Sequence, residues 1–510
     1  RRMMADLVTI DRASQNTAPG LARSWSISND GLHYRLNLRR GLRFSDGHPF
    51  DADDVLFTFR VLLDDRIQSP QRDLLLVEGK PIRVSKSDAH TVRVDFPKPY
   101  GAAERIFDSI AILPRHLLEQ DYEQGRLQSA WPVTVAPEKI AGLGPFRLKS
   151  YLAGQRIVLE RNPYYWRTDA KGQRLPYLDE LVFTPAGGED VQIARFVEGS
   201  TQVAPRLSAR NFAVLARDPK GAQLADLGPS LEYAFLFFNL NALDSDKQAR
   251  LGVAQSWFLD RRFRQAVSAA IDRDAIVKVV FDGRAAAIAS HVTPGNRRWF
   301  LTTGAKPRRD LDLSRRLLAE AGFRASANGK LMDAQGRPVR FTLLTSSSNS
   351  ERLQTATMIR DDLKAVGIEM DVVPFEFRAL LDRILKTHDY EACLMALGGG
   401  DADPNSEMNV WTTGGATHFW NFNRTPFAWE TEIDSLMRRQ LTATSFAERK
   451  RDYDRVQQIA ARELPLIPLV SPHVLVAAKG TLGNFHPAVL DHNTLWNADV
   501  LYLQAPGSAR

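Results

Sequence analysis

The 510-residue chain contains a single cysteine, Cys393, and no run of about 18 consecutive apolar residues. A lone cysteine excludes an internal disulfide and cysteine-rich metal sites. Without a long apolar run, we expect no membrane-spanning helix. Cys393 lies in the apolar segment 392–397, which predicts a buried strand and a thiol in the core. The cysteine count leaves the compartment open, because chains without disulfides occur in the cytosol and in the periplasm.

Long stretches of one charge are also missing. The formal charge is +7, from 67 Lys and Arg against 60 Asp and Glu, but the two signs are interleaved along the chain. Basic clusters such as 308–309 and 438–439 are short, and no nucleic-acid-binding motif accompanies them. We interpret the excess as a solvated basic surface and expect no nucleic-acid partner. Residues 1–4 are followed by no apolar stretch, so we expect no secretory signal within this chain.

Catalytic and metal-binding motifs are missing too. The chain has no Gly-x-Ser-x-Gly, no His-Glu-x-x-His and no Gly-x-x-x-x-Gly-Lys, and its ten histidines form no cluster at ligand spacing. We therefore expect no catalytic residue, no metal and no cofactor. Asp401 and Asp403 give little support to catalysis: a glycoside hydrolase needs two acids that flank the scissile bond, and these two are close in sequence. A hydrolase is the less favoured alternative.

The composition that is present is that of an ordinary folded protein. Hydrophobic residues make up 44% and charged residues 25% of the chain. Its length exceeds the roughly 250–300 residues at which single cores stop growing. We therefore expect at least two folding units.

The first 160 residues are rich in strand patterns. Residues 21–38 alternate polar and apolar side chains around Asn29-Asp30-Gly31, which predicts a β-hairpin. Asp51, with Asp54 three residues later, predicts the capped start of a helix. Further strand pairs are expected within 82–94 and 146–159.

The second half mixes helix and strand spacing. Strand 341–344, helix 350–366 and strand 368–373 predict a β-α-β unit, which implies a parallel strand pair. The other elements expected are helices at 260–271, 310–322, 379–385 and 446–464 and strands at 235–241, 390–397 and 467–470. The pattern is that of a mixed α/β protein.

Several sequence blocks resemble one known family. The most specific are Leu21-Ala22-Arg23-Ser24-Trp25, Asp30-Gly31-Leu32, Phe44-Ser45-Asp46-Gly47-His48-Pro49-Phe50 and Asp53-Asp54-Val55. Further blocks lie at 142–146, 157–166, 263–273 and 317–323. In this order, and over nearly the entire chain, they are similar to the family 5 extracellular solute-binding proteins, the dipeptide- and oligopeptide-binding components of ABC importers.

The resemblance implies an α/β fold of the periplasmic binding protein type II kind, with three lobes, mixed sheets flanked by helices and a ligand cleft between lobes. We expect lobe I to combine residues 1–15, 148–240 and 475–510, lobe II to be the insertion 16–147, and lobe III to be residues 241–474. Family members usually begin a few dozen residues earlier, so the N-terminal part of lobe I is expected to be truncated.

The resemblance also implies a function. The chain would capture a small solute, above all a di- or oligopeptide, without catalysis, and deliver it to the membrane permease of the importer. An oligosaccharide or a nickel complex is the alternative solute. We expect a monomer in the periplasm or outside the cell, attached to the outer face of the cytoplasmic membrane in a Gram-positive host. Solute binding is expected to shift the lobes toward a closed form.

The glycine-rich segment after strand 390–397 is the sharpest candidate site. Gly398, Gly399 and Gly400 precede Asp401 and Asp403, and a strand end that opens into a flexible turn is where α/β clefts hold ligands. The resemblance implies that Asp401 pairs with the α-ammonium of the ligand, with Asp403 as a competitor. The alternative is that both aspartates cap a turn or a helix start.

Aromatic residues supply the other candidates. Trp411 and Trp420 flank Gly414-Gly415 and would form apolar ligand walls, with core packing as the alternative. Phe235, Phe237 and Asn239 lie on the strand that resembles the one along the bound solute, but alternation alone predicts a half-buried strand.

Overall fold

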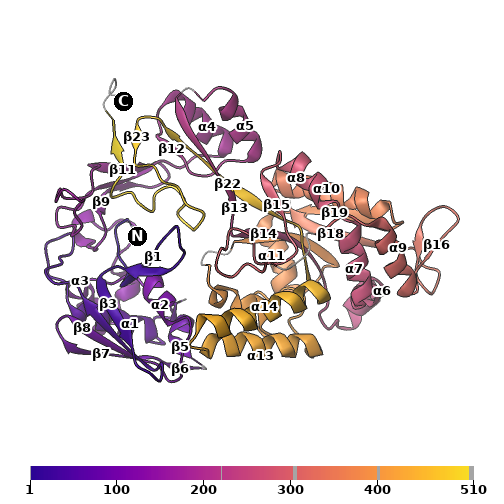
Figure 1. Cartoon of the computed structure of the whole chain (residues 1–510), viewed down its shortest axis with the longest axis horizontal. Helices are drawn as coiled ribbons and strands as arrows, with labels where there is room; N and C mark the ends of the chain where they lie inside the picture. Colours follow the sequence, from indigo (N-terminus) through magenta and orange to yellow (C-terminus); the bar gives the residue numbers. More distant parts are fainter. Residues whose placement is uncertain are drawn as a thin grey trace.

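The three-dimensional structure is a computed structural model that describes residues 2–69, 71–77, 79–219, 221–302, 307–398 and 402–504. Figure 1 shows an indigo N-terminal part on one side and a larger part, built mainly from residues after 230, on the other. Helices α13 and α14 lie between them along one edge. Within the described residues, no helix is both long enough and apolar enough to cross a membrane.

The N-terminal part is built on an antiparallel sheet of order β3-β4-β8-β7. Its strands are β3 (Ala22–Ile27), β4 (His33–Leu38), β8 (Thr91–Asp95) and β7 (Arg83–Asp88). The predicted hairpin is confirmed, and Gly31 in its turn has a φ of 72°, which glycine adopts without strain. Leu36, Val92 and Val94 of the sheet pack with Val55 and Phe59 of helix α1 (Ala52–Leu63) in one core.

Helix α1 begins as the sequence predicts. The Asp51 N–H donates to Asp54 Oδ2 at 3.1 Å, and the Asp51 carboxylate accepts from the first turn of the helix. This capping box satisfies donors that a helix start leaves free. Helices α2 (Ala103–Ser109) and α3 (Arg115–Glu123) complete this part.

A second layer joins the middle of the chain to its C-terminal segment. Strands β9 (Phe146–Leu152), β10 (Arg156–Arg161) and β11 (Glu180–Phe183) form one antiparallel sheet. The long strand β22 (Val470–Lys479) pairs with β12 (Val203–Ala204), β13 (Ala222–Pro229) and β15 (Ala285–Ala287). Helices α4 (Glu189–Glu198) and α5 (Ala209–Arg217) lie beside them. Phe146 and Leu159 share a core with Val476 and Leu501, so the chain end returns to the middle segment.

The largest part surrounds a five-stranded sheet of order β19-β18-β20-β14-β21. Its strands are β19 (Glu369–Phe375), β18 (Arg340–Ser346), β20 (Ala392–Gly398), β14 (Glu232–Phe238) and β21 (Leu466–Pro468). Strands β18 and β19 are parallel and joined by α10 (Ser350–Lys364), which confirms the predicted β-α-β unit. Strand β14 pairs with β20 and β21, although the predicted lobe boundary at residue 240 assigns it to lobe I. The lobe boundaries stay a prediction.

The predicted core thiol is confirmed. Cys393 lies in the middle of β20 and is fully buried. Burial raises the pKa of its thiol well above the ordinary value, so the group stays protonated and acts as a small apolar side chain.

Helix α10 packs against the five-stranded sheet, and the larger part carries further helices. They are α6 (Ser245–Phe258), α7 (Arg261–Ala270), α8 (Arg273–Val280), α9 (Leu311–Glu320), α11 (Phe377–Asp382), α12 (Met408–Trp411), α13 (Ala428–Thr442) and α14 (Phe446–Glu463). The short strands are β1 (Val8–Ile10), β2 (Thr17–Pro19), β5 (Leu76–Val77), β6 (Lys80–Pro81), β16 (Arg324–Ala325), β17 (Leu331–Met332), β23 (Leu482–Gly483) and β24 (Tyr502–Leu503). Short helical turns are η1 (Arg72–Leu75), η2 (Leu127–Ser129), η3 (Pro137–Lys139), η4 (Arg383–Thr387) and η5 (Pro404–Glu407).

Candidate functional site

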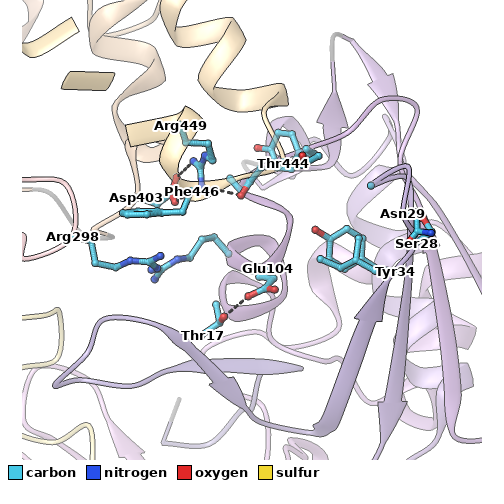
Figure 2. Close-up of a pocket in the computed structure, with 16 residues that line it drawn as sticks. Thr17, Ser28, Asn29, Tyr34, Glu104, Arg298, Asp403, Thr444, Phe446 and Arg449 are labelled. Carbon is cyan, nitrogen blue, oxygen red and sulfur yellow. Dashed lines mark hydrogen bonds and ion pairs between the residues drawn. The ribbon is translucent and has the colours of Figure 1, made fainter. Parts of the chain in front are cut away.

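A cavity of about 260 Å³ lies where the N-terminal part meets the connection between α13 and α14 (Figure 2). Segments far apart in the sequence line it. They are the hairpin turn around residues 27–31, the start of α2 around residues 100–105, and residues from 298 onward in the larger part. The lining residues are Thr17, Ile27, Ser28, Asn29, Gly31, Tyr34, Tyr100, Gly101, Ala102, Glu104, Arg105, Arg298, Asp403, Thr444, Phe446 and Arg449.

Asp403 and Arg449 form a buried ion pair in the wall of this cavity. Arg449 Nη2 lies 2.7 Å from Asp403 Oδ1, and Nη1 lies 3.0 Å from Oδ2, a bidentate arrangement. The side chains of Arg449 and Asp403 are 7% and 3% exposed. Asp403 Oδ1 also accepts from the Asn405 N–H at 3.0 Å, so the carboxylate caps the turn η5 as well. Both of its oxygens are therefore engaged by protein groups.

Arg449 also connects the two sides of the cavity. Its Nη1 donates to the carbonyl oxygen of Gly101 at 2.8 Å, and its Nη2 donates to Gln440 Oε1 at 3.0 Å. The Gly101 N–H donates to the Leu441 carbonyl at 2.7 Å. A Cβ at position 101 would lie 2.3 Å from the Ala443 carbonyl oxygen, so this close approach requires glycine.

Two further charged side chains in the wall are engaged by the N-terminal part. Glu104 accepts hydrogen bonds from the Thr17 hydroxyl and, at 2.9 Å, from Trp25 Nε1. Arg105 is 5% exposed and donates from Nη2 to the Gln15 carbonyl at 2.6 Å. Figure 2 shows Arg298 reaching in from the side opposite to Tyr34, below the ring of Phe446.

Neutral hydroxyl groups complete the wall. Burial raises the pKa of the Tyr34 and Tyr100 phenols well above the ordinary value, so both stay protonated. Tyr34 packs edge-on against Phe96, with ring centroids 5.3 Å apart, and Tyr100 stacks on the same ring. The cavity thus offers both signs of charge, neutral hydroxyls and aromatic surface, which is the composition of a site for a small polar solute.

A second, water-sized cavity of about 20 Å³ lies behind Asp403. Its wall includes His291, Glu407 and Tyr453. His291 Nε2 lies 3.1 Å from the Tyr453 hydroxyl, and the Tyr233 hydroxyl lies 3.0 Å from Glu407 Oε2. Burial lowers the pKa of His291 to about 3 and raises the pKa of Glu407 to about 7. Burial therefore favours the neutral form of both groups in the folded protein.

Of the residues predicted in the glycine-rich segment, Asp403 lies at the cavity. Gly399, Gly400 and Asp401 fall outside the described residues, so the assignment of Asp401 to the ligand ammonium stays a prediction. Asp403 matches the capping alternative, through η5, and adds an ion pair that sequence spacing did not indicate.

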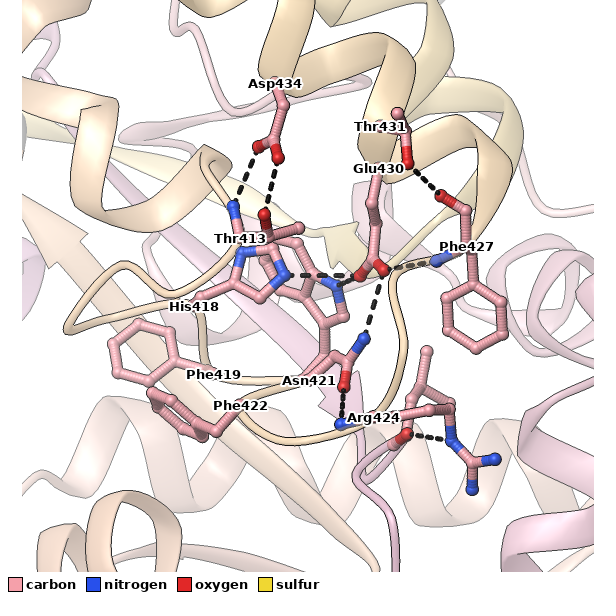
Figure 3. A network of polar contacts seen from close by, with 12 residues as sticks. Thr413, His418, Phe419, Asn421, Phe422, Arg424, Phe427, Glu430, Thr431 and Asp434 are labelled. Carbon is pink, nitrogen blue, oxygen red and sulfur yellow. Dashed lines mark hydrogen bonds and ion pairs between the residues drawn. The ribbon is translucent and has the colours of Figure 1, made fainter. Parts of the chain in front are cut away.

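The predicted tryptophans lie in the core of the larger part. Trp411 is 1% exposed and Trp420 is fully buried, and neither lines the cavity. Trp420 Nε1 donates to Glu430 Oε1 at 2.7 Å within the polar network of Figure 3. The centroids of the Trp411 and His291 rings lie 4.2 Å apart. The core-packing alternative describes both side chains in this structure.

The predicted residues of β14 and its C-terminal end are likewise buried. Phe235 and Phe237 are fully buried in the main core. Asn239 is 1% exposed, and its Nδ2 donates to the carbonyls of His388 and Tyr390 at 2.9 and 2.7 Å. None of the three lines the cavity, so their contact with solute stays a prediction.

Sequence reasoning did not find Glu104, Arg298 or Arg449. Arg449 does leave a signal, because it is a charged residue on the face of α14 that buries Tyr453 and Val456. A buried arginine needs a partner. Arg298 lies in an irregular loop whose sequence gives no such signal.

Comparison with known proteins identifies the family. The profile of the bacterial extracellular solute-binding proteins, family 5 (middle region), matches residues 16–419. The chain belongs to this family. The predicted resemblance is therefore confirmed.

Individual relatives cover most of the chain. A probable ABC transporter-binding protein of Deinococcus radiodurans is 28% identical over 484 residues, which is 90% of this chain and 80% of the relative. Oligopeptide-binding protein AppA of Bacillus subtilis is 25% identical over a match that covers 95% of this chain and 84% of the relative.

Solved structures agree on the fold. The substrate-binding protein CtaP of Listeria monocytogenes superposes with a TM-score of 0.81 at 22% identity, over 99% of this chain and 93% of its own. AppA of Bacillus subtilis with a nonapeptide gives a TM-score of 0.74 at 23% identity, with the same coverage. The predicted α/β fold of the type II binding proteins is confirmed.

Proposed function

We propose that this family 5 protein is the substrate-binding component of an ABC importer, and that it captures a di- or oligopeptide and delivers it to the membrane permease. The observation that carries the proposal is the cavity between the N-terminal part and the α13–α14 connection, which is lined from both sides and carries both signs of charge. A zwitterionic peptide needs a site of this kind, because its charged ends lose water on binding.

The names of relatives support a peptide. AppA of Bacillus subtilis is named oligopeptide-binding, a Pseudomonas aeruginosa relative di/tripeptide-binding and an Escherichia coli relative dipeptide-binding. Other relatives differ: one of Haemophilus influenzae is named heme-binding, and NikZ of Campylobacter jejuni was solved with a nickel–histidine complex. A non-peptide solute is therefore the second candidate.

The proposed mechanism is capture without turnover. Solute would bind the N-terminal part and the larger part together, and Asp401 would pair with the ammonium group of a peptide. We infer a monomer that works in the periplasm, or at the outer face of the cytoplasmic membrane in a Gram-positive host. The permease would distinguish the closed form.

The test is a peptide panel with two readouts. Synthetic di-, tri- and pentapeptides are mixed with the protein, and both the melting temperature and the integrity of each peptide are measured. At about 100-fold excess over the dissociation constant, a bound peptide stabilises the protein by roughly 2.7 kcal/mol. We expect such a shift with peptides recovered intact.

Other outcomes would overturn the proposal in different ways. A shift with a sugar or a metal chelate, and none with peptides, would show that the solute is not a peptide. Cleavage of the peptide during incubation would show an enzyme.

A further inference from the structure

We infer that the captured solute carries a carboxylate and that Arg298 is the residue that pairs with it. The inference rests on the proposed function, because it places the solute in the same cavity. It adds the chemical class of the solute and assigns one contact.

The first observation is that Arg298 has no partner for its charge. Among the residues that the structure describes, its guanidinium forms no ion pair and donates no hydrogen bond, although it lines the cavity. Its guanidinium carbon lies 4.6 Å from the centre of the Phe446 ring. This cation–π contact holds the group at the cavity but leaves the N–H donors at its edge free.

The second observation is that the other charged side chains of the wall are engaged. Arg449 holds Asp403, and Glu104 accepts from Thr17 and Trp25. Arg105 is buried and donates to the Gln15 carbonyl. Removing any of these groups from its partner would cost free energy, whereas Arg298 can accept a ligand without breaking a protein hydrogen bond.

The third observation is electrostatic. Burial and the positive charges of Arg105 and Arg449 lower the pKa of Arg298, against the opposing effect of Asp403 and Glu104. The surroundings of Arg298 therefore disfavour its charge. An anion beside the guanidinium would reverse this effect, so binding of an anion is favoured over binding of a neutral group.

The geometry of a guanidinium selects the anion. Its parallel N–H groups match the two oxygens of a carboxylate, which gives a bidentate pair stronger than a neutral hydrogen bond. In a peptide, the carboxylate comes either from an acidic side chain or from the C-terminus. Both sources share the same chemistry, and a matched set of peptides separates them.

The experiment uses four such tripeptides. Ala-Glu-Ala and Ala-Gln-Ala are each prepared with a free C-terminus and with a C-terminal amide, and their dissociation constants are measured by calorimetry. We expect the neutral Ala-Gln-Ala amide to bind at least about tenfold more weakly than the peptide that carries the preferred carboxylate. Ala-Glu-Ala amide carries only a side-chain carboxylate, whereas Ala-Gln-Ala with a free C-terminus carries only the C-terminal one. Comparing their dissociation constants shows which of the two carboxylates the protein binds.

The same titrations are repeated on three variants. Arg298→Gln should remove the preference for the carboxylate, and Arg298→Lys should keep part of it, because lysine retains the charge but not the bidentate geometry. Arg308→Gln removes an exposed arginine that does not line the cavity, and should leave all four constants unchanged. Equal melting temperatures without ligand show that the variants are folded.

The outcomes separate this inference from the proposed function. If all four peptides bind equally and Arg298→Gln changes nothing, the inference is wrong and peptide capture stands. If no peptide binds, glutarate and citrate are titrated as small carboxylates. If either acid binds and Arg298→Gln abolishes that binding, the result supports the pairing of Arg298 with a carboxylate but overturns the proposal that the solute is a peptide. If neither acid binds, both claims are overturned.

Discussion

Buried ionisable residues next to the cavity carry charge states that differ from those in water. Glu407 is held against Tyr233, and His291 lies between Trp411 and Tyr453. Burial raises the pKa of Glu407 to about 7 and lowers the pKa of His291 to about 3. Because Asp403 lines both cavities, these groups lie directly behind the Asp403–Arg449 pair.

The raised pKa of Glu407 has a defined effect on stability. The ordinary pKa of a glutamate carboxyl is 4.5, and burial raises the pKa of Glu407 to about 7 in the folded chain. Between these values the folded state holds more protons, so the Glu407 contribution to the free energy of unfolding falls as pH rises. Glu407→Gln should therefore gain stability relative to the wild type from pH 4.5 to 7, by at most about 3 kcal/mol. Urea denaturation across this pH range measures the difference.

A matched control is Glu198→Gln. Glu198 is exposed at the end of α4, so the substitution removes one negative charge without touching the buried cluster. A constant free-energy difference between Glu407→Gln and the wild type across this pH range would contradict the account of Glu407.

The pH dependence of the His291 contribution has the opposite sign. Burial lowers the pKa of His291 to about 3, so this side chain stays neutral in the folded protein, and its contribution to the free energy of unfolding falls as pH drops below about 6.5.

Single residues could be predicted where their signal is local. The Asp51 cap with Asp54 and the buried thiol of Cys393 follow from neighbours in the sequence, and both are confirmed. The partners of Asp403 could not be predicted, because Arg449 lies 46 residues away on another element. For the same reason, the position of Arg298 in the cavity wall depends on contacts that sequence spacing does not encode.

At the scale of elements, the segment between α12 and α13 depends on one carboxylate. Glu430, in the first turn of α13, is 1% exposed. It lies 3.2 Å from His418 Nε2 and accepts from Trp420 Nε1, from Asn421 Nδ2 at 3.0 Å and from the Phe427 N–H at 2.8 Å (Figure 3). These contacts fold residues 418–427 against the start of the helix.

Loss of this carboxylate should be severe. Glu430→Ala would leave several buried donors without an acceptor, and each costs about 1–3 kcal/mol. We expect the free energy of unfolding, measured by urea denaturation, to fall by at least about 3 kcal/mol. Glu432→Ala is the control, because Glu432 is partly exposed and pairs with Arg455 at the surface, a contact worth at most about 1 kcal/mol. Similar losses in the two variants would show that the network does not hold the segment.

Elements with a clear periodicity were predictable, and elements defined by long-range pairing were not. The β-α-β unit of β18, α10 and β19 and the helix α14 appear where the sequence indicates them. Helix α13 was not predicted, and its capping glutamate is recognisable only beside the loop that it organises. The placement of β14 between β20 and β21 depends on strands more than 150 residues away.

At the scale of the whole molecule, segments distant in sequence meet around one cavity. Strand β22, in the last part of the chain, pairs with β12 and β13, and α14 presents Arg449 to Gly101 of the N-terminal part. Ordered sequence blocks predicted the fold, which the solved relatives confirm, because the order of elements restricts the topology. The position of the cavity could not be predicted, since it depends on how the parts meet.

The central claim is that solute is captured in this cavity, and a cavity-filling variant tests it most directly. Thr444 lies exposed between α13 and α14 and lines the cavity, so Thr444→Trp should place an indole where the solute binds. Thr431→Trp, at an exposed site on α13 that does not line the cavity, is the control. The measurement is native mass spectrometry of each protein mixed with an equimolar di- and tripeptide library.

We predict one intact peptide per chain for the wild type and for Thr431→Trp, and at least about tenfold weaker occupancy for Thr444→Trp. Equal occupancy of Thr444→Trp and the wild type would place the solute elsewhere and contradict the account.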